Sequence, residues 1–146
     1  MRIRLLCTLL AALPAYAQVK AENAWARATP PGAKIAAGYL TIRNTAGSAD
    51  RLLGIASPGA EKVQMHITVK DGDIFRMREV RSYDIPANGS LELKPGGGHL
   101  MFVNIKAPLK EGDKVPATLR FERAGEMKVE FHVGSLGAAA PRAHSH

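Results

Sequence analysis

The sequence contains a single cysteine, Cys7, and that residue lies within the first 17 positions. The rest of the chain therefore has no disulfide framework, no thiolate nucleophile and no thiolate metal ligand. Aromatic residues make up only 5% of the sequence. No apolar run after residue 17 is long enough to cross a bilayer, so no membrane insertion is expected. No segment keeps an apolar period of 3.6 residues, which disfavours an α-helical domain.

Acidic residues are also fewer than basic ones, with 13 Asp and Glu against 20 Lys and Arg. The basic residues are scattered, and few aromatic rings are available on which bases could stack. A solvated surface explains this charge better than nucleic-acid binding does. No nucleic-acid partner is therefore expected.

The N-terminal residues have the pattern of a secretory signal peptide. Arg2 and Arg4 precede an apolar run from Leu5 to Leu13, and Ala15-Tyr16-Ala17 supplies the small residues of an A-x-A cleavage site. The apolar run is too short for a membrane anchor. Cys7 lacks the preceding small residues that lipid attachment requires, so we interpret it as part of the removed segment. This pattern predicts a signal peptide over residues 1–17 and export to the periplasm.

The remaining chain consists of short strand-like pieces between turns rich in Gly, Pro, Asn and Asp. This pattern predicts an all-β sandwich or barrel over residues 18–135 as one domain. Residues 136–146 are poor in large apolar side chains and predict a flexible tail. The expected strands are 36–44, 51–57, 62–70, 73–80, 90–94, 99–106, 115–122 and 127–133.

One hairpin allows the strand pairing to be predicted in detail. Asp71-Gly72 favours a two-residue type I′ turn, in which Lys70 pairs with Asp73. His66 then lies directly opposite Met77, with Cβ atoms about 4.5–5.5 Å apart on one face. The two side chains are close enough to share one ligand.

The other face of the first strand is apolar and is predicted to point into the core. Met65 belongs to this face, so His66 points away from the core. Arg76 and Arg78 interrupt the same face on the second strand. A bulge, an edge position or a shifted register therefore stays open.

A second pair of donors follows a run of three glycines. His99 and Met101 are two residues apart on an expected strand, so both side chains leave the same face. With His66 and Met77 they form a neutral set of two imidazoles and two thioethers, which suits Cu(I) better than magnesium, calcium or zinc. The glycine run, 96–98, would let the loop approach the ion closely.

Other residues of the same types have simpler interpretations. A single methionine is most often a core residue, and we interpret Met65 and Met127 in this way. His132 is interpreted as a surface or hydrogen-bonded residue. From the residues alone, a metal site competes with purely structural roles for the four donors.

The order His66, ten residues, Met77, twenty-one residues, His99, one residue, Met101 resembles the signature of the periplasmic copper chaperones called PCu(A)C. The resemblance covers most of the chain after residue 17. It includes, in the family's order, AWAR at 24–27, AAGYLTIRN at 36–44, RLLG at 51–54, IPANGSLELKPGGGHLMF at 85–102 and LRFE at 119–122.

The resemblance implies a cupredoxin-like β-sandwich that binds Cu(I) through these four side chains. It also implies delivery of the ion to the binuclear copper centre of cytochrome c oxidase. The implied partners are the copper-bearing subunit of the oxidase and Sco-type thioredoxin-like copper proteins.

Several alternative functions stay open at this point. Periplasmic copper buffering or tolerance without a dedicated acceptor would use the same four donors. Blue-copper electron transfer is disfavoured because that site requires a cysteine thiolate. An enzyme is not expected, since no nucleophile–base arrangement is evident and an ion with four protein ligands has no open position for substrate. A metal-free interaction domain is the last alternative.

The chain ends in a short segment with two histidines, His144 and His146. Imidazole and backbone nitrogen atoms suit Cu(II) better than thioethers do. The segment therefore suggests a second, weaker Cu(II) site, with an uninvolved tail as the alternative.

Overall fold

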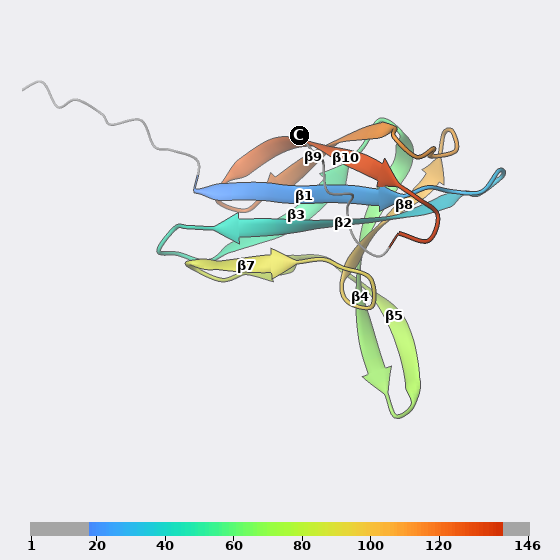
Figure 1. The fold of residues 1–146 in the computed structure, drawn as a ribbon. Helices are drawn as coiled ribbons and strands as arrows, with labels where there is room; N and C mark the ends of the chain where they lie inside the picture. The colour runs from blue at the N-terminus through green and yellow to red at the C-terminus, as the bar shows by residue number, and fades with distance from the viewer. Residues whose placement is uncertain (1–17, 139–146) are drawn as a thin grey trace, which may run out of the picture.

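The computed structural model describes residues 18–138, and these form ten β-strands (Figure 1). The expected all-β class is confirmed. Within this range no helix is long and apolar enough to span a membrane. The strands are β1 (Val19–Arg27), β2 (Ile35–Asn44), β3 (Asp50–Ala56), β4 (Ala60–Asp71), β5 (Ile74–Val80), β6 (Tyr83–Ile85), β7 (Gly89–Glu92), β8 (His99–Ile105), β9 (Lys114–Phe121) and β10 (Gly125–Gly134).

The strands form one continuous sheet, in the order β5-β4-β8-β2-β1-β10-β9-β3-β6. β3 also pairs with β4 through Ile55 and Val63, which closes the strands from β4 round to β3 into a ring. β7 pairs with one half of β2 while β8 pairs with the other half. The expected cupredoxin-like sandwich of two sheets is therefore replaced by a single barrel-like sheet.

Alternating apolar side chains fill the interior of this barrel. On β9 every second residue is buried, from Val115 to Phe121, because successive side chains of a strand point to opposite faces. The rings of Phe102 and Phe131 meet edge to face in the centre, with centroids 5.4 Å apart. Both side chains are at most 1% exposed, so the core lies between β8 and β10.

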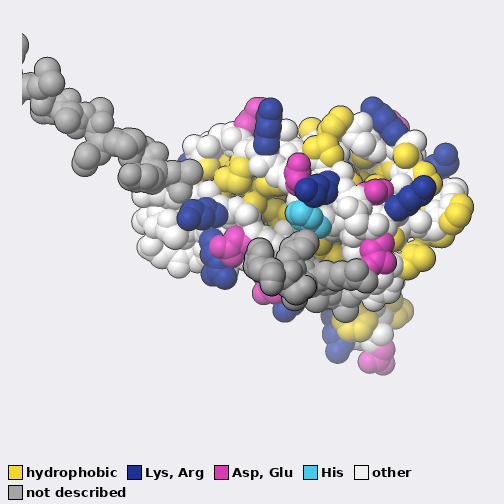
Figure 2. Space-filling model, turned by 45° about the horizontal axis from the view of Figure 1, so that its top comes forward, with side chains coloured by type: hydrophobic (Ala, Val, Ile, Leu, Met, Phe, Trp, Pro, Cys, Tyr) yellow, Lys and Arg dark blue, Asp and Glu magenta, His cyan; other side chains and the backbone are white. Residues whose placement is uncertain are grey.

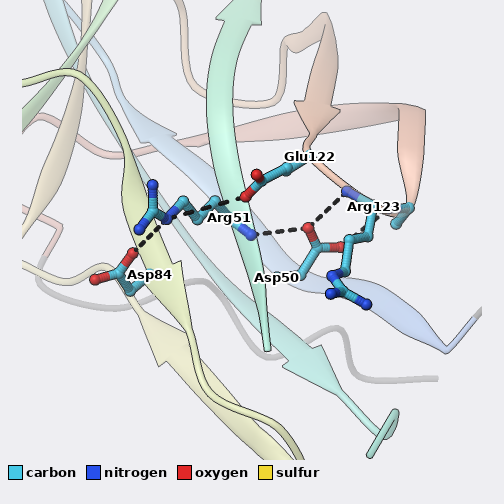
Figure 3. A network of polar contacts seen from close by, with 6 residues as sticks. Asp50, Arg51, Asp84, Glu122 and Arg123 are labelled. Carbon is cyan, nitrogen blue, oxygen red and sulfur yellow. Dashed lines mark hydrogen bonds and ion pairs between the residues drawn. The ribbon is translucent and has the colours of Figure 1, made fainter. Parts of the chain in front are cut away.

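At the end of the barrel away from the β4–β5 hairpin, a buried carboxylate joins two neighbouring segments by hydrogen bonds. Asp50 is 5% exposed and accepts hydrogen bonds from the backbone N–H groups of Arg51, Arg123 and Ala124, at 2.8, 2.9 and 3.0 Å (Figure 3). These bonds satisfy the carboxylate within the protein, as a buried charge requires. They tie the start of β3 to the turn between β9 and β10.

The β4–β5 hairpin extends from the barrel as a two-stranded arm (Figure 1). β5 is the last strand of the sheet, and six of its seven residues are exposed. The edge position accommodates Arg76 and Arg78 on the nominally apolar face.

The predicted register of this hairpin is wrong by two residues. Asp71 pairs with Ile74, so Gly72 and Asp73 form the turn, and only Gly72 has a positive φ, of 63°. A positive φ confined to the first central residue is the requirement of a type II′ turn, not of the expected type I′ turn. Met77 therefore lies opposite Thr68, and His66 lies opposite Glu79.

Charged side chains of both signs are interspersed over the face of the molecule shown in Figure 2. No field of one sign dominates this face. Scattered charges of this kind are typical of a solvated surface.

Candidate metal centre

The four predicted donors come from three adjacent strands. His66 on β4 and His99 on β8 are direct cross-strand partners. Met101 lies two residues further along β8, opposite Gln64. Thr68, two residues from His66 in the other direction on β4, lies opposite Met77. The register differs from the predicted one by two residues, and a shift of two keeps every side chain on its original face, so Met77 and His66 still share a face.

The two histidine rings lie against each other at the centre of this arrangement. Their centroids are 5.2 Å apart, and the ring planes are inclined by 40°. His99 is 9% exposed, and its burial is the main reason that its pKa falls below the usual value. The nearby Gly97 carbonyl opposes this shift, while His66 adds to it. A lowered pKa keeps the His99 imidazole neutral, which is the form that binds a metal ion.

Three of the four donors line one pocket of about 390 Å³: Met77, His99 and Met101. His66 does not line this pocket, but its ring lies against the ring of His99, which does. Met77 is 65% exposed, whereas Met101 is half-buried. The pocket thus lies where the hairpin leaves the barrel.

The hydrogen bonds of the histidines leave one nitrogen of each ring available. His66 Nε2 lies 3.1 Å from the Gln64 side-chain oxygen, which can only accept, so the proton is on Nε2. His66 Nδ1 then carries a lone pair. Among residues 18–138 it is the one buried side-chain nitrogen or oxygen without a hydrogen-bond partner. His99 Nδ1 lies 3.5 Å from the Gly97 carbonyl, which leaves its Nε2 free.

These contacts fit a metal ion. Histidines that bind metals usually donate their second N–H to a carbonyl or carboxylate, which orients the ring and selects the tautomer. Leaving a buried polar atom unsatisfied costs about 1–3 kcal/mol. A soft cation at His66 Nδ1 would remove that cost.

The charge around the pocket does not favour hard cations. Arg27 and Arg76 line it, and no carboxylate does so in the part of the chain that the structure describes. That part also contains no group of three or more His, Cys, Asp and Glu side chains that could hold a metal ion. The soft side-chain donors that line the pocket beside His99 are therefore the thioethers of Met77 and Met101.

The glycine loop borders the pocket and also packs against the core. Gly96 lines the pocket, whereas a Cβ added at Gly98 would lie 2.9 Å from a methyl carbon of Leu93. Thr68 donates a hydrogen bond to the Gly97 carbonyl at 3.0 Å, which ties the loop to β4. Glycine at position 98 is thus required for packing, a role that the sequence did not indicate.

The other sequence interpretations have mixed outcomes. Met65 is 6% exposed and belongs to the core, Met127 packs against the core, and His132 is exposed. His144 and His146 lie outside the described residues.

The sequence did not identify Gln64 and Tyr83, which form hydrogen bonds with the side chain or the backbone of the histidines. Gln64 could have been found, since it is two residues from His66 on the same face, but Tyr83 gives no local signal.

The chain is similar to proteins of one family over most of its length. The family model described as "LpqE-like: Putative lipoprotein LpqE-like" matches residues 19–133. A relative from Leifsonia xyli, named "Putative lipoprotein Lxx21020", is 34% identical over 136 residues, covering 87% of this chain and 81% of the relative.

Solved structures with similar folds include copper-bound proteins. The copper-bound PCuAC domain from PmoF2 is 30% identical with a TM-score of 0.71, covering 81% of this chain and 93% of the domain. The Cu(I) form of DR1885 from Deinococcus radiodurans is 31% identical with a TM-score of 0.62, covering 86% of this chain and 81% of that structure.

Proposed function

Since the chain belongs to the LpqE-like family and its structural neighbours include PCuAC domains, we propose that it is a copper chaperone that binds one Cu(I) ion through His66, Met77, His99 and Met101. The observation that carries the proposal is the 5.2 Å pairing of the two histidine rings, beside a pocket lined by both methionines. Copper is the cargo, and no catalysis is involved.

The donor set favours Cu(I) over other biological cations. Imidazole and thioether are neutral, soft ligands, and they match the preference of monovalent copper. Thioethers do not titrate and cannot form disulfides, so they stay functional in an oxidising compartment. The lipoprotein name of the Leifsonia relative supports an exported protein of the cell envelope, and the N-terminal pattern of this chain supports the periplasm.

The surroundings of the pocket favour transfer to another protein. Ile35, Phe75 and Met77 line the pocket while remaining 50%, 68% and 65% exposed. Exposed apolar side chains around a binding site commonly mark a protein interface. Arg27 and Arg76 would attract a partner with an acidic rim. We propose the copper-bearing subunit of cytochrome c oxidase or a Sco-type protein as this partner.

A competition titration tests the binding. Residues 18–146 should take up one equivalent of Cu(I) against a chelator, and Met77→Ala or Met101→Ala should weaken binding far more than Met127→Ala. Equal effects from all three substitutions would contradict the assigned face.

A deletion strain grown on limiting copper separates delivery from buffering. Delivery predicts that the oxidase loses copper and activity, and that externally added copper restores both. Normal oxidase together with raised sensitivity to excess copper would favour the buffering alternative.

A second binding site in the C-terminal tail is favoured by one contact. Arg27, which lines the pocket, donates a hydrogen bond to the Ala138 carbonyl at 2.8 Å. His144 is six residues further along the chain, and six residues span at most roughly 20 Å. We propose that His144 and His146 collect Cu(II) near the pocket. Truncation after Ala140 should then abolish Cu(II) binding and preserve Cu(I) binding, whereas unchanged Cu(II) stoichiometry would end this proposal.

A further inference from the structure

The hydroxyl group of Tyr83 lies between the backbones of the two histidines. Tyr83 is on β6 and is 6% exposed. Its hydroxyl oxygen is 2.5 Å from the His66 carbonyl oxygen and 2.9 Å from the His99 carbonyl oxygen. One side chain from a third strand thus bonds β4 and β8 at the level of both imidazoles.

This contact lies at the end of the β4–β8 ladder. His66 and His99 form the last pair of the β4–β8 ladder, and β8 begins at His99. On the other side of this pair the chain continues into the glycine loop. The ladder therefore supports the pair from one side and the Thr68–Gly97 hydrogen bond from the other, and the Tyr83 hydroxyl bonds the pair itself.

The chemistry of a buried tyrosine suits a permanent donor. Both partners are carbonyl oxygens, which only accept, so the single hydroxyl proton is shared between them. The Tyr83 hydroxyl is therefore the donor in both bonds.

The aromatic ring of Tyr83 supports the same region by packing. A Cβ added at Gly98 would lie 3.7 Å from a carbon of the Tyr83 ring and 3.5 Å from the His66 carbonyl oxygen. The Gly98 carbonyl in turn accepts a hydrogen bond from the Lys94 N–H at 3.0 Å. The ring therefore holds the end of the loop from which His99 emerges.

We propose that Tyr83 is a positioning residue that sets the spacing of His66 and His99 for Cu(I) by bonding both of their carbonyl groups. The proposal rests on the copper function proposed above. The copper site would then include one buried residue of the core in addition to the four donor residues. Loss of an outer-shell partner of a metal ligand typically lowers metal affinity about 10- to 100-fold.

Tyr83→Phe tests the proposal, because it removes the hydroxyl and keeps the ring. Ser57→Ala is the matched control, since it also removes a buried hydroxyl that donates to a backbone carbonyl. Ser57 is 9% exposed, bonds the Pro116 carbonyl at 2.7 Å and does not line the pocket. Cu(I) affinity is measured by chelator competition under conditions where both variants are folded by circular dichroism. We expect Tyr83→Phe to bind about 10- to 100-fold more weakly, with Ser57→Ala close to wild type.

A copper-free measurement separates this proposal from the proposed function. The nuclear Overhauser effect between the His66 and His99 ring protons reports their spacing in the apo protein. It should weaken in Tyr83→Phe and persist in Ser57→Ala, even if the wild-type protein were to bind no Cu(I). An unchanged effect, or equal losses of affinity in the two variants, would overturn the positioning role.

Discussion

Apolar side chains of the same types are buried in the barrel and exposed in the arm formed by the β4–β5 hairpin. Phe102 in the barrel is 1% exposed, whereas Phe75 in the hairpin is 68% exposed. Met65, on the part of β4 that pairs with β8 in the barrel, and Met77, on β5, differ similarly, at 6% and 65%. Both members of each pair lie on strands of one sheet, so strand formation does not explain the difference. The barrel uses its apolar side chains for stability, and the hairpin presents them to solvent.

The candidate centre lies where these two regions meet. His99 and Met101 belong to a barrel strand, and Met77 belongs to the exposed hairpin. A chaperone must hold its ion and also release it. Two donors on the barrel strand provide a fixed base, while an exposed methionine can be replaced by a ligand from the acceptor.

The largest expected contrast is in the contribution of phenylalanine to folding. Phe102→Ala should lower the free energy of unfolding by about 3–5 kcal/mol, because it leaves a cavity in the core. Phe75→Ala should change it by less than about 0.5 kcal/mol, as expected for an exposed residue. Urea denaturation of the copper-free protein measures both. Similar losses would show that the hairpin is part of the cooperative core.

The methionine pair should separate stability from copper binding. Met65→Ala should lower the free energy of unfolding by about 2–5 kcal/mol and leave Cu(I) affinity nearly unchanged. Met77→Ala should leave stability within about 0.5 kcal/mol and weaken Cu(I) binding. Denaturation and chelator competition on the same samples measure both quantities. A parallel change in the two quantities for either variant would remove the distinction between the regions.

The buried carboxylate of the barrel offers a smaller contrast, far from the hairpin. Asp50→Asn should lower the free energy of unfolding by about 1–3 kcal/mol, because an NH₂ group replaces one accepting oxygen among three N–H donors. Asp84→Asn is the control: the Asp84 side chain is 84% exposed, and its ion pair with Arg51 (Figure 3) should contribute at most about 1 kcal/mol. Thermal or urea denaturation compares the two variants.

The smallest expected effect is the pH dependence contributed by His99. Burial lowers its pKa in the folded protein, whereas the unfolded chain takes up the proton near pH 6.5. In the window below about pH 6.5 and above the folded pKa, the unfolded state binds more protons, so stability falls as the pH falls. His99→Gln should flatten this slope in the copper-free protein, and His132→Gln is the control. An unchanged slope in His99→Gln would contradict the burial effect.

The donor face could be predicted from the sequence although the hairpin register could not. Alternation along a strand fixes the face of a side chain, and Met77 keeps its face because the register shift is two residues. The turn type depends on the backbone angles at Asp71, Gly72 and Asp73. Asp-Gly and Gly-Asp are both acceptable two-residue turns, so the overlapping Asp-Gly-Asp sequence allows either.

The closure of the sheet could not be predicted from local patterns. The eight expected strands match eight of the observed strands within two residues at each end, but β1 and β6 were missed. Alternation shows which side chains point inward, and it is the same in a sandwich and in a barrel. Closure depends on the pairing of Ile55 with Val63, a contact between strands that no turn signal specifies.

Of the two residues that form hydrogen bonds with the histidines, one could be predicted from the sequence and the other could not. Gln64 is two residues from His66, so alternation alone places it on the same face. Tyr83 reaches the carbonyl groups of His66 and His99 because β6 pairs with β3, which the closure of the sheet brings next to β4. Contacts of this kind depend on the three-dimensional closure of the sheet.

X-ray absorption of the Cu(I)-loaded protein tests the central claim most directly. We predict a copper ion with two nitrogen and two sulfur scatterers in the wild type and in Met65→Ala, and loss of one sulfur scatterer in Met77→Ala and in Met101→Ala. A spectrum with nitrogen and oxygen scatterers alone, or a sulfur count that neither Met77→Ala nor Met101→Ala reduces, would contradict a centre built jointly by the barrel and the hairpin.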